Sequence, residues 1–103
     1  MSYRLLITND ANNDIDDIVS YIVNVLKNPI AAKNLLTKIE SSFDIISTNP
    51  FAFPLCNDKR LHDDGYRKIT VKNYIVFYKV DEADDTVYIM RVIYGRRDYI
   101  KLI

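Results

Sequence analysis

The sequence is poor in the residues that crosslink a fold or bind metal ions. It has one cysteine, Cys56, one histidine, His62, and no tryptophan. A single cysteine excludes an internal disulfide and any metal site built from several cysteines, which fits a reducing compartment such as the cytoplasm. We expect Cys56 to be a partly buried small hydrophobic residue in a loop. Nothing in the sequence indicates a metal, nucleotide or organic cofactor, and we expect none.

Long hydrophobic runs are also absent. No apolar segment approaches the roughly 18–20 residues that span a membrane, and the N-terminal residues lack the long apolar segment of a signal peptide. The apolar fraction of 49% and the charged fraction of 27% are typical of an ordinary soluble globular protein. A chain of 103 residues can form one domain with a modest core. We therefore expect one domain, residues 1–103, that is cytoplasmic and has no membrane partner.

The chain has no net charge, but its charges are unevenly distributed. Residues 66–103 carry eight basic and five acidic side chains, and four of the five acids lie in the segment 81–85. Outside that segment, Asp98 is the only acid in this part of the chain. A local basic surface of this kind indicates a polyanion or an acidic protein as partner.

Two stripes of apolar residues at helical spacing predict two helices. The first stripe occupies residues 11–26, after three candidate N-caps, Thr8, Asn9 and Asp10, and the second occupies residues 32–46. Asn28-Pro29 between them is a stop for the first helix and an N-cap with proline at N1 for the second. The short connection predicts an antiparallel helical hairpin.

Segments rich in β-branched and aromatic residues predict the strands. They are residues 3–8, 66–71, 74–80 and 86–94. Lys72-Asn73 is predicted to be a two-residue hairpin turn in which Asn73 takes the left-handed conformation. The order β-α-α-β-β-β predicts an α+β fold, in which the helical hairpin packs on an antiparallel sheet completed by a three-stranded C-terminal meander. We expect the strand 74–80 to be central and the N-terminal strand to lie beside a C-terminal one.

Several motifs follow one another in an order that is specific in combination, although each alone is ordinary. They are Thr8-x-x-Ala11-x-x-Asp14-Ile15-x-x-Ile18, Thr48-Asn49-Pro50, Gly65-Tyr66-Arg67, Asn73-Tyr74-Ile75-Val76-Phe77-Tyr78, and Arg91-Val92-Ile93-Tyr94-Gly95-Arg96-Arg97-Asp98. Over nearly the full chain, this order resembles the toxins of the RelE/ParE superfamily of bacterial type II toxin–antitoxin modules.

The resemblance implies a toxin that inhibits bacterial growth and is neutralised by a cognate antitoxin, with which it can form a hetero-oligomer. ParE-like members inhibit DNA gyrase and have no accepted nuclease chemistry. RelE-like members are enzymes that cut messenger RNA in the ribosomal A site without a metal. A third possibility is a relative that binds an antitoxin but has lost its target. The chain is therefore an enzyme only under the RelE-like interpretation.

Under the RelE-like interpretation, RNA cleavage needs acid–base groups and preorganised cations. The candidate catalytic residues are then Arg67, Arg91, Arg97 and Tyr99. RelE-like nucleases usually carry an arginine just after the first tyrosine of the strand 74–80, and this chain has Ile75 there. Isoleucine cannot bind phosphate, so the ParE-like interpretation, inhibition of DNA gyrase, is favoured over a ribosome-dependent mRNA endonuclease.

Independently of the target, the end of the last strand is predicted to form a basic binding surface. The candidate target-binding residues are Tyr94, Arg96, Arg97 and Lys101. Arg67 and Arg91 also have structural alternatives, since a strand arginine can pair with an acid such as Asp98 or cover an aromatic ring. We expect His62 to be a solvated loop residue.

Two further expectations concern residues outside this surface. Asp14, Asp16 and Asp17 follow one another closely on the first predicted helix. We interpret them as a solvated helix face. Leu102 and Ile103, at the end of the chain, are expected to anchor the C-terminal segment on the core.

Overall fold

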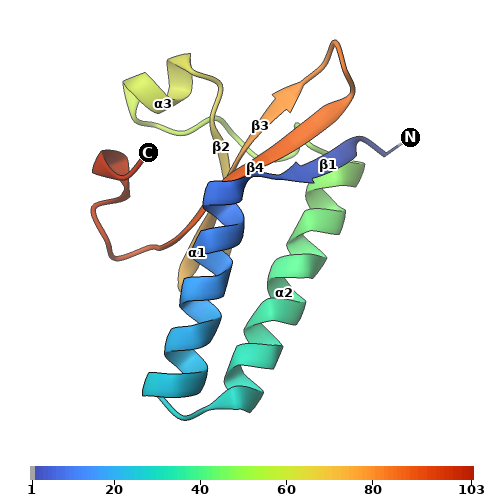
Figure 1. Cartoon of the computed structure of the whole chain (residues 1–103). Coiled ribbons are helices and arrows are strands. Elements are labelled where there is room, and N and C mark those ends of the chain that lie inside the picture. The colour runs from blue at the N-terminus through green and yellow to red at the C-terminus, as the bar shows by residue number, and fades with distance from the viewer. Residues whose placement is uncertain (1) are drawn as a thin grey trace.

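The computed structural model describes residues 2–103 and has a four-stranded sheet with two long helices packed on one face (Figure 1). The strands are β1 (Arg4–Ile7), β2 (Arg67–Val71), β3 (Tyr74–Asp81) and β4 (Thr86–Tyr94). The helices are α1 (Asn9–Ser20), α2 (Pro29–Thr48) and the short α3 (Lys59–Asp63). The predicted α+β order is confirmed, and α3 is an addition that the sequence did not predict.

The sheet is mixed, with the strand order β1-β4-β3-β2. β3 is central and antiparallel to both neighbours, as predicted, but β1 is parallel to β4. The reason is the length of α2, which brings the chain back beside the start of β1, where the Tyr3 amide donates to the Ser47 carbonyl at 2.8 Å. The chain re-enters the sheet from that end, so β2, and β4 after two hairpins, run in the direction of β1.

Side-chain N-caps set where the two long helices begin. The Thr8 hydroxyl accepts from the Ala11 amide, and the Asn28 side chain accepts from the Ala31 amide, with Pro29 at N1. Thr8 is therefore the cap among the three candidates, with Asn9 and Asp10 inside the helix, and the Asn28 cap is confirmed. The hairpin turn differs in one respect, because the positive φ of 53° falls on Lys72 and not on Asn73.

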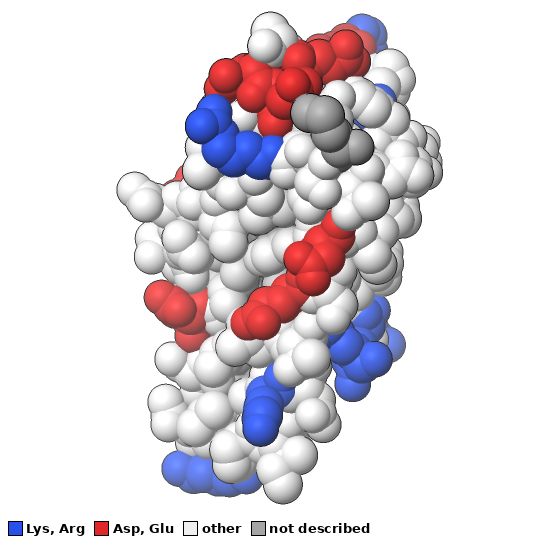
Figure 2. Space-filling view, turned by 90° about the vertical axis from the view of Figure 1, so that its right-hand side faces the viewer, with Lys and Arg blue, Asp and Glu red and all other residues white. Residues whose placement is uncertain are grey.

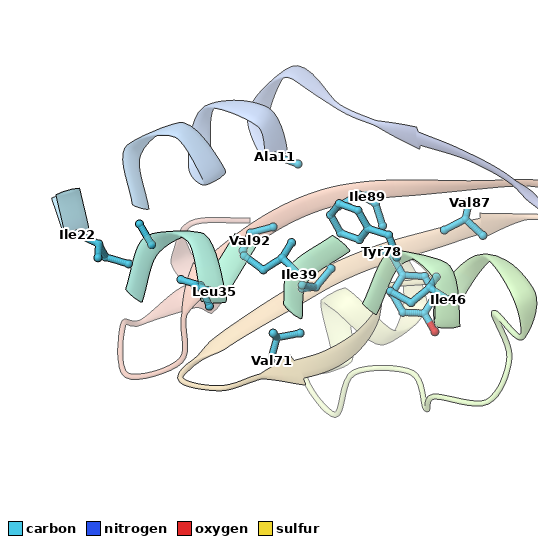
Figure 3. Close-up of a cluster of buried hydrophobic side chains, with 13 residues drawn as sticks. Ala11, Ile22, Leu35, Ile39, Ile46, Val71, Tyr78, Val87, Ile89 and Val92 are labelled. Atoms are coloured by element: carbon cyan, nitrogen blue, oxygen red, sulfur yellow. The ribbon is translucent and has the colours of Figure 1, made fainter. Parts of the chain in front are cut away.

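The main core lies between the sheet and the long helices (Figure 3). Its members include Ile22, Leu35, Ile39 and Ile46 from the helical layer and Val76, Tyr78, Ile89 and Val92 from the sheet. A second cluster, Cys56, Leu61, Tyr66, Phe77 and Ile93, lies on the other face of the sheet. Leu102 and Ile103 pack against the second cluster, as predicted. None of the helices within residues 2–103 is long and apolar enough to cross a membrane.

Candidate functional site

The end of β4 presents two exposed arginines on a tight turn. The Gly95 amide donates to the Asn73 carbonyl at 2.8 Å, and a Cβ on Gly95 would lie only 3.3 Å from the same oxygen. The Arg97 amide then donates to the Tyr94 carbonyl at 3.0 Å. Within residues 2–103, neither Arg96 nor Arg97 forms an ion pair. We call Tyr94, Arg96 and Arg97 the arginine patch.

Tyrosines extend the arginine patch toward the helices. The rings of Tyr74 and Tyr94 meet edge to face, with 5.6 Å between their centroids. Burial raises the pKa of Tyr74, and the neighbouring phenols of Tyr94 and Tyr21 raise it further, so this hydroxyl stays neutral at physiological pH. A groove of about 670 Å³ lies here, between α1 and the ends of β3 and β4. Its lining residues are Asp17, Ile18, Tyr21, Leu26, Asn73, Tyr74, Tyr94 and Arg97.

Arg91 is held by helix α1 and by the chain end. Its Nε and Nη2 donate to the two carboxylate oxygens of Asp14 at 2.7 and 2.9 Å, and its Nη1 donates to the Leu102 carbonyl at 2.6 Å. The Asp14 carboxylate also accepts from the Val92 amide at 2.9 Å. The hydrogen bond to Asp14 raises the pKa of Arg91, which therefore remains charged. The prediction that Asp14 belongs to a solvated face is wrong, because its side chain is only 15% exposed.

Arg67 lies at the other end of the helix-covered face and has its own partners. Its Nη1 donates to the Phe53 carbonyl at 2.6 Å, and its guanidinium lies 5.0 Å from the centroid of the Phe51 ring. In the sheet Arg67 is opposite Tyr78, whereas Tyr94 is opposite Tyr74. Four strand residues separate these rows, or about 13 Å at 3.3 Å per residue. Arg67 is therefore not brought to the arginine patch.

The remaining candidates lie elsewhere. Tyr99 packs on the second cluster, with its ring centroid 5.2 Å from that of Phe77. Lys101 is exposed and lies 3.5 Å from the Asp98 carboxylate. His62 is half exposed on α3, beside Asp63, so the expectation of a solvated histidine holds although its segment is helical.

The structure thus brings some candidates together and keeps others apart. Arg91 and Arg97 line a shallow pocket of about 100 Å³ next to Asp14 and Asp17, and Arg97 also lines the larger groove with Tyr94. Arg67 and Tyr99 line neither. Ile75 packs against the second cluster, and its side chain lies 3.6 Å from where a Gly95 Cβ would be. The sequence did not single out Tyr21 and Leu26, because both fell within or beside a stripe that predicts buried residues.

Comparison with known proteins identifies the family. Residues 5–99 match the family described as ParE toxin of type II toxin-antitoxin system, parDE. The chain belongs to the ParE toxin family. It is therefore the toxin component of a type II toxin–antitoxin system, and the resemblance seen in the sequence is confirmed. No curated protein matches the chain.

Solved toxin structures share the fold of this ParE family member. One, from the chromosomal ParDE system of P. aeruginosa, is 21% identical with a TM-score of 0.72, and the match covers 90% of this chain and 96% of that one. A mutant of E. coli toxin RelE in the free state is 13% identical with a TM-score of 0.68, covering 99% and 93%. The RelBE2 toxin–antitoxin complex of Mycobacterium tuberculosis contributes a third match, 22% identical with a TM-score of 0.61, covering 91% and 99%.

Proposed function

We propose that this toxin inhibits bacterial growth by binding DNA gyrase through the arginine patch, and that a cognate antitoxin neutralises it in the cytoplasm. The observation that carries the proposal is the separation of the groups that RNA cleavage would require. Arg91 is bound to Asp14 and Leu102, Arg67 is bound to Phe53, and Tyr99 packs on the second cluster.

Metal-free RNA cleavage places a base, an acid and a charge-stabilising group within hydrogen-bond reach of one phosphate. Arg67 lies about 13 Å along the sheet from the arginine patch, too far to share one phosphate with it. Burial raises the pKa of the Cys56 thiol, which is therefore not a nucleophile. The side chain at Ile75 supplies no cation. These features support binding rather than nuclease chemistry.

The arginine patch suits recognition of a protein surface. Tyrosine and arginine are the residue types that dominate the binding energy of protein interfaces. The exposed guanidinium groups of Arg96 and Arg97 can each form bidentate hydrogen bonds with a carboxylate. Lys101 lies further along the same C-terminal segment, where its ammonium group pairs with Asp98. A protein target with acidic side chains is therefore the natural partner of this surface.

Family membership and the solved relatives support the proposal that this chain has a cognate antitoxin as partner. The P. aeruginosa match belongs to a ParDE system, and the M. tuberculosis match is a toxin–antitoxin complex. We infer that this chain also forms a hetero-oligomer with an antitoxin. The RelE-like alternative, a ribosome-dependent mRNA endonuclease, rests on the shallow pocket that Arg91 and Arg97 share.

Two reactions run in parallel test the target. Purified toxin is added to DNA gyrase with relaxed plasmid, and to a reconstituted bacterial translation reaction whose messenger RNA ends are then mapped. We expect supercoiling to be lost and the message to stay intact. New ends at A-site codons with normal supercoiling would instead establish the RelE-like activity. If neither reaction changes and induction leaves growth normal, the chain is an antitoxin-binding relative without a target.

A further inference from the structure

The arginine patch is too small to be the whole surface that contacts gyrase. It consists of three residues, whereas a stable protein interface buries roughly 800 Å² on each partner and involves about 20–30 residues a side. The residues that dominate the binding energy also lie near the centre of an interface, in pockets from which water is excluded. A surface that binds gyrase stably therefore extends beyond the arginine patch, toward a hollow that a partner's side chain can fill.

The molecule is hollowed directly beside the arginine patch. The groove of about 670 Å³ between α1 and the ends of β3 and β4 is lined by Tyr94 and Arg97 of the patch. A second hollow, of about 210 Å³, lies between the helix junction and the β2–β3 turn. Leu26, Asn73 and Tyr74 line both hollows, which therefore adjoin. We call the two hollows together the tyrosine groove.

Apolar side chains are exposed in and near the tyrosine groove. Tyr21 and Leu26, which line it, are 53% and 55% exposed. Val25 and Ile30 are 61% and 73% exposed, so four of the nine large hydrophobic residues exposed within residues 2–103 fall within ten positions of the sequence. Leaving apolar surface in water is unfavourable, and a concentration of it on a folded protein marks a site of interaction.

The backbone of this segment is irregular. Residues Tyr21–Val25 form a π-helical turn, in which the Leu26 amide donates to the Tyr21 carbonyl at 3.1 Å. Such turns occur frequently at functional sites. Lys27 then has a φ of 55°, a left-handed conformation that is unfavourable for a residue with a side chain. Backbone strain of this kind is concentrated at binding and active sites, so both features favour a functional role for residues 21–27.

The charges around the tyrosine groove favour an acidic partner. Arg97 and Lys72 line it and Lys27 follows Leu26 in the chain, whereas Asp17 is the one acid among the described residues that line it. On the face that Figure 2 shows, the charged side chains of the described residues at the lower end, where α1 and α2 meet in Figure 1, are all Lys or Arg. A second copy of the toxin would bring like charges together here, so a partner that carries carboxylates fits better.

We propose that the tyrosine groove is the centre of the gyrase-binding surface and receives an apolar side chain of gyrase that is flanked by carboxylates. The apolar side chain packs against Tyr21, Leu26 and Tyr74, and the carboxylates pair with Arg97 and Lys72. Tyrosine rings supply a large contact area at a low cost in conformational entropy, and arginine adds directional hydrogen bonds to a carboxylate. The inference rests on the proposed function, since it concerns binding to the same target.

The test compares wild-type toxin with two groove variants in a supercoiling assay and in titration calorimetry with purified gyrase. Tyr21→Ala removes an exposed ring, and Leu26→Glu places a negative charge where carboxylates are expected to bind. Ile45→Glu is the control, because Ile45 is 50% exposed and lines neither hollow. It lies ten residues beyond Leu35 on α2, or about 15 Å along the helix from the groove. We expect both groove variants to raise the dissociation constant and the inhibitory concentration at least about tenfold, and the control to match wild type.

Thermal unfolding identifies any variant that fails to fold, and Tyr21→Ala decides the question if Leu26→Glu does not fold. If wild-type toxin inhibits gyrase and the folded groove variants inhibit it equally well, the inference is overturned and the proposed function stands. If wild-type toxin neither binds gyrase nor blocks supercoiling, the proposed function fails and the inference falls with it. Sedimentation of the toxin alone tests the competing occupant. A wild-type dimer that Leu26→Glu separates without loss of gyrase inhibition would assign the groove to a contact between two toxin copies and overturn the inference.

Discussion

At the scale of single residues, Asp14 joins three parts of the chain. Its carboxylate binds the Arg91 guanidinium and the Val92 amide, and Arg91 in turn binds the carbonyl of Leu102. The side chains of Asp14 and Arg91 are 15% and 23% exposed, so solvent screens the pair only weakly. Asp14 thus fixes the position of β4 just before the strand reaches the arginine patch.

Replacing Asp14 by alanine is expected to destabilise the protein by about 2–4 kcal/mol, because it leaves a largely buried guanidinium without its counter-ion. Chemical denaturation of purified protein measures this change. Asp16→Ala is the matched control, since Asp16 lies on the same helix but is exposed, and it should leave stability nearly unchanged. If Asp14→Ala and Asp16→Ala unfold at the same denaturant concentration, the Asp14–Arg91 pair does not stabilise the fold.

We expect the free energy of unfolding to depend on pH through the ionisation of Tyr78. Its side chain is fully buried and its hydroxyl donates to the Pro50 carbonyl at 2.7 Å. Burial raises the pKa of Tyr78 from 10.0 to about 12, an effect that Arg67 only partly opposes. The folded state therefore holds this proton more tightly than the unfolded state. The resulting stabilisation is fully present below pH 10 and is lost as the pH rises from 10 to about 12.

We expect the unfolding free energy to fall by about 2–3 kcal/mol between pH 9.5 and pH 12 because of Tyr78. Urea unfolding followed by circular dichroism across this range measures it. Tyr78→Phe should be less stable at neutral pH, since it leaves the Pro50 carbonyl unpaired, but its stability should depend less on pH. Tyr21→Phe, at an exposed tyrosine, is the control, and its unfolding free energy should depend on pH as that of wild type does. A Tyr78→Phe profile parallel to wild type would contradict the assignment.

At the scale of elements, the C-terminal segment forms one wall of the second cluster. Figure 1 shows it beside α3, away from the long helices. The Arg60 guanidinium donates to the Ile100 carbonyl at 2.7 Å, and Leu102 and Ile103 are partly buried against the cluster. Deleting Leu102 and Ile103 should therefore lower stability by about 2–3 kcal/mol and lower the melting temperature. Lys101→Ala is the control, and an unchanged melting temperature after the deletion would exclude this role.

Local signals let the sequence predict most elements of the fold. The caps at Thr8 and Asn28 depend on neighbours three residues away, and the strands follow from β-branched and aromatic composition. The parallel pairing of β1 depends on where α2 ends, which is a tertiary property. The π-helical turn was also unpredicted, because an apolar stripe does not reveal a change of helical pitch. Val25 and Leu26, at the end of the π-helical turn, lie outside the core that their spacing predicted.

The candidate site was predictable only in part, because some of its contacts join residues far apart in the sequence. Tyr94, Arg96 and Arg97 are neighbours in the sequence; in the structure Tyr94 and Arg97 line one groove, and Arg96 is exposed on the turn between them. The partner of Arg91 could not be predicted, since Asp14 lies 77 positions away and the nearby Asp98 was an equally reasonable choice. Contacts between residues far apart in the chain are set by packing, which a single sequence does not encode in any local pattern.

At the scale of the whole molecule, the most acidic segment and the arginine patch lie apart. The acidic β3–β4 connection, residues 81–85, precedes β4, and the arginine patch lies at the other end of that strand. The core between them is closed on both faces of the sheet.

The most direct test of the proposed mechanism is inhibition of DNA gyrase by the wild-type toxin and by the double variant Arg96→Ala, Arg97→Ala. We expect wild type to block supercoiling and the double variant to lose inhibition at least about tenfold while keeping its fold. Lys33→Ala with Lys38→Ala removes the same charge from α2 and should inhibit like wild type. If the folded double variant blocks supercoiling as well as wild type does, the arginine patch does not bind gyrase. If wild type leaves supercoiling intact, gyrase is not the target.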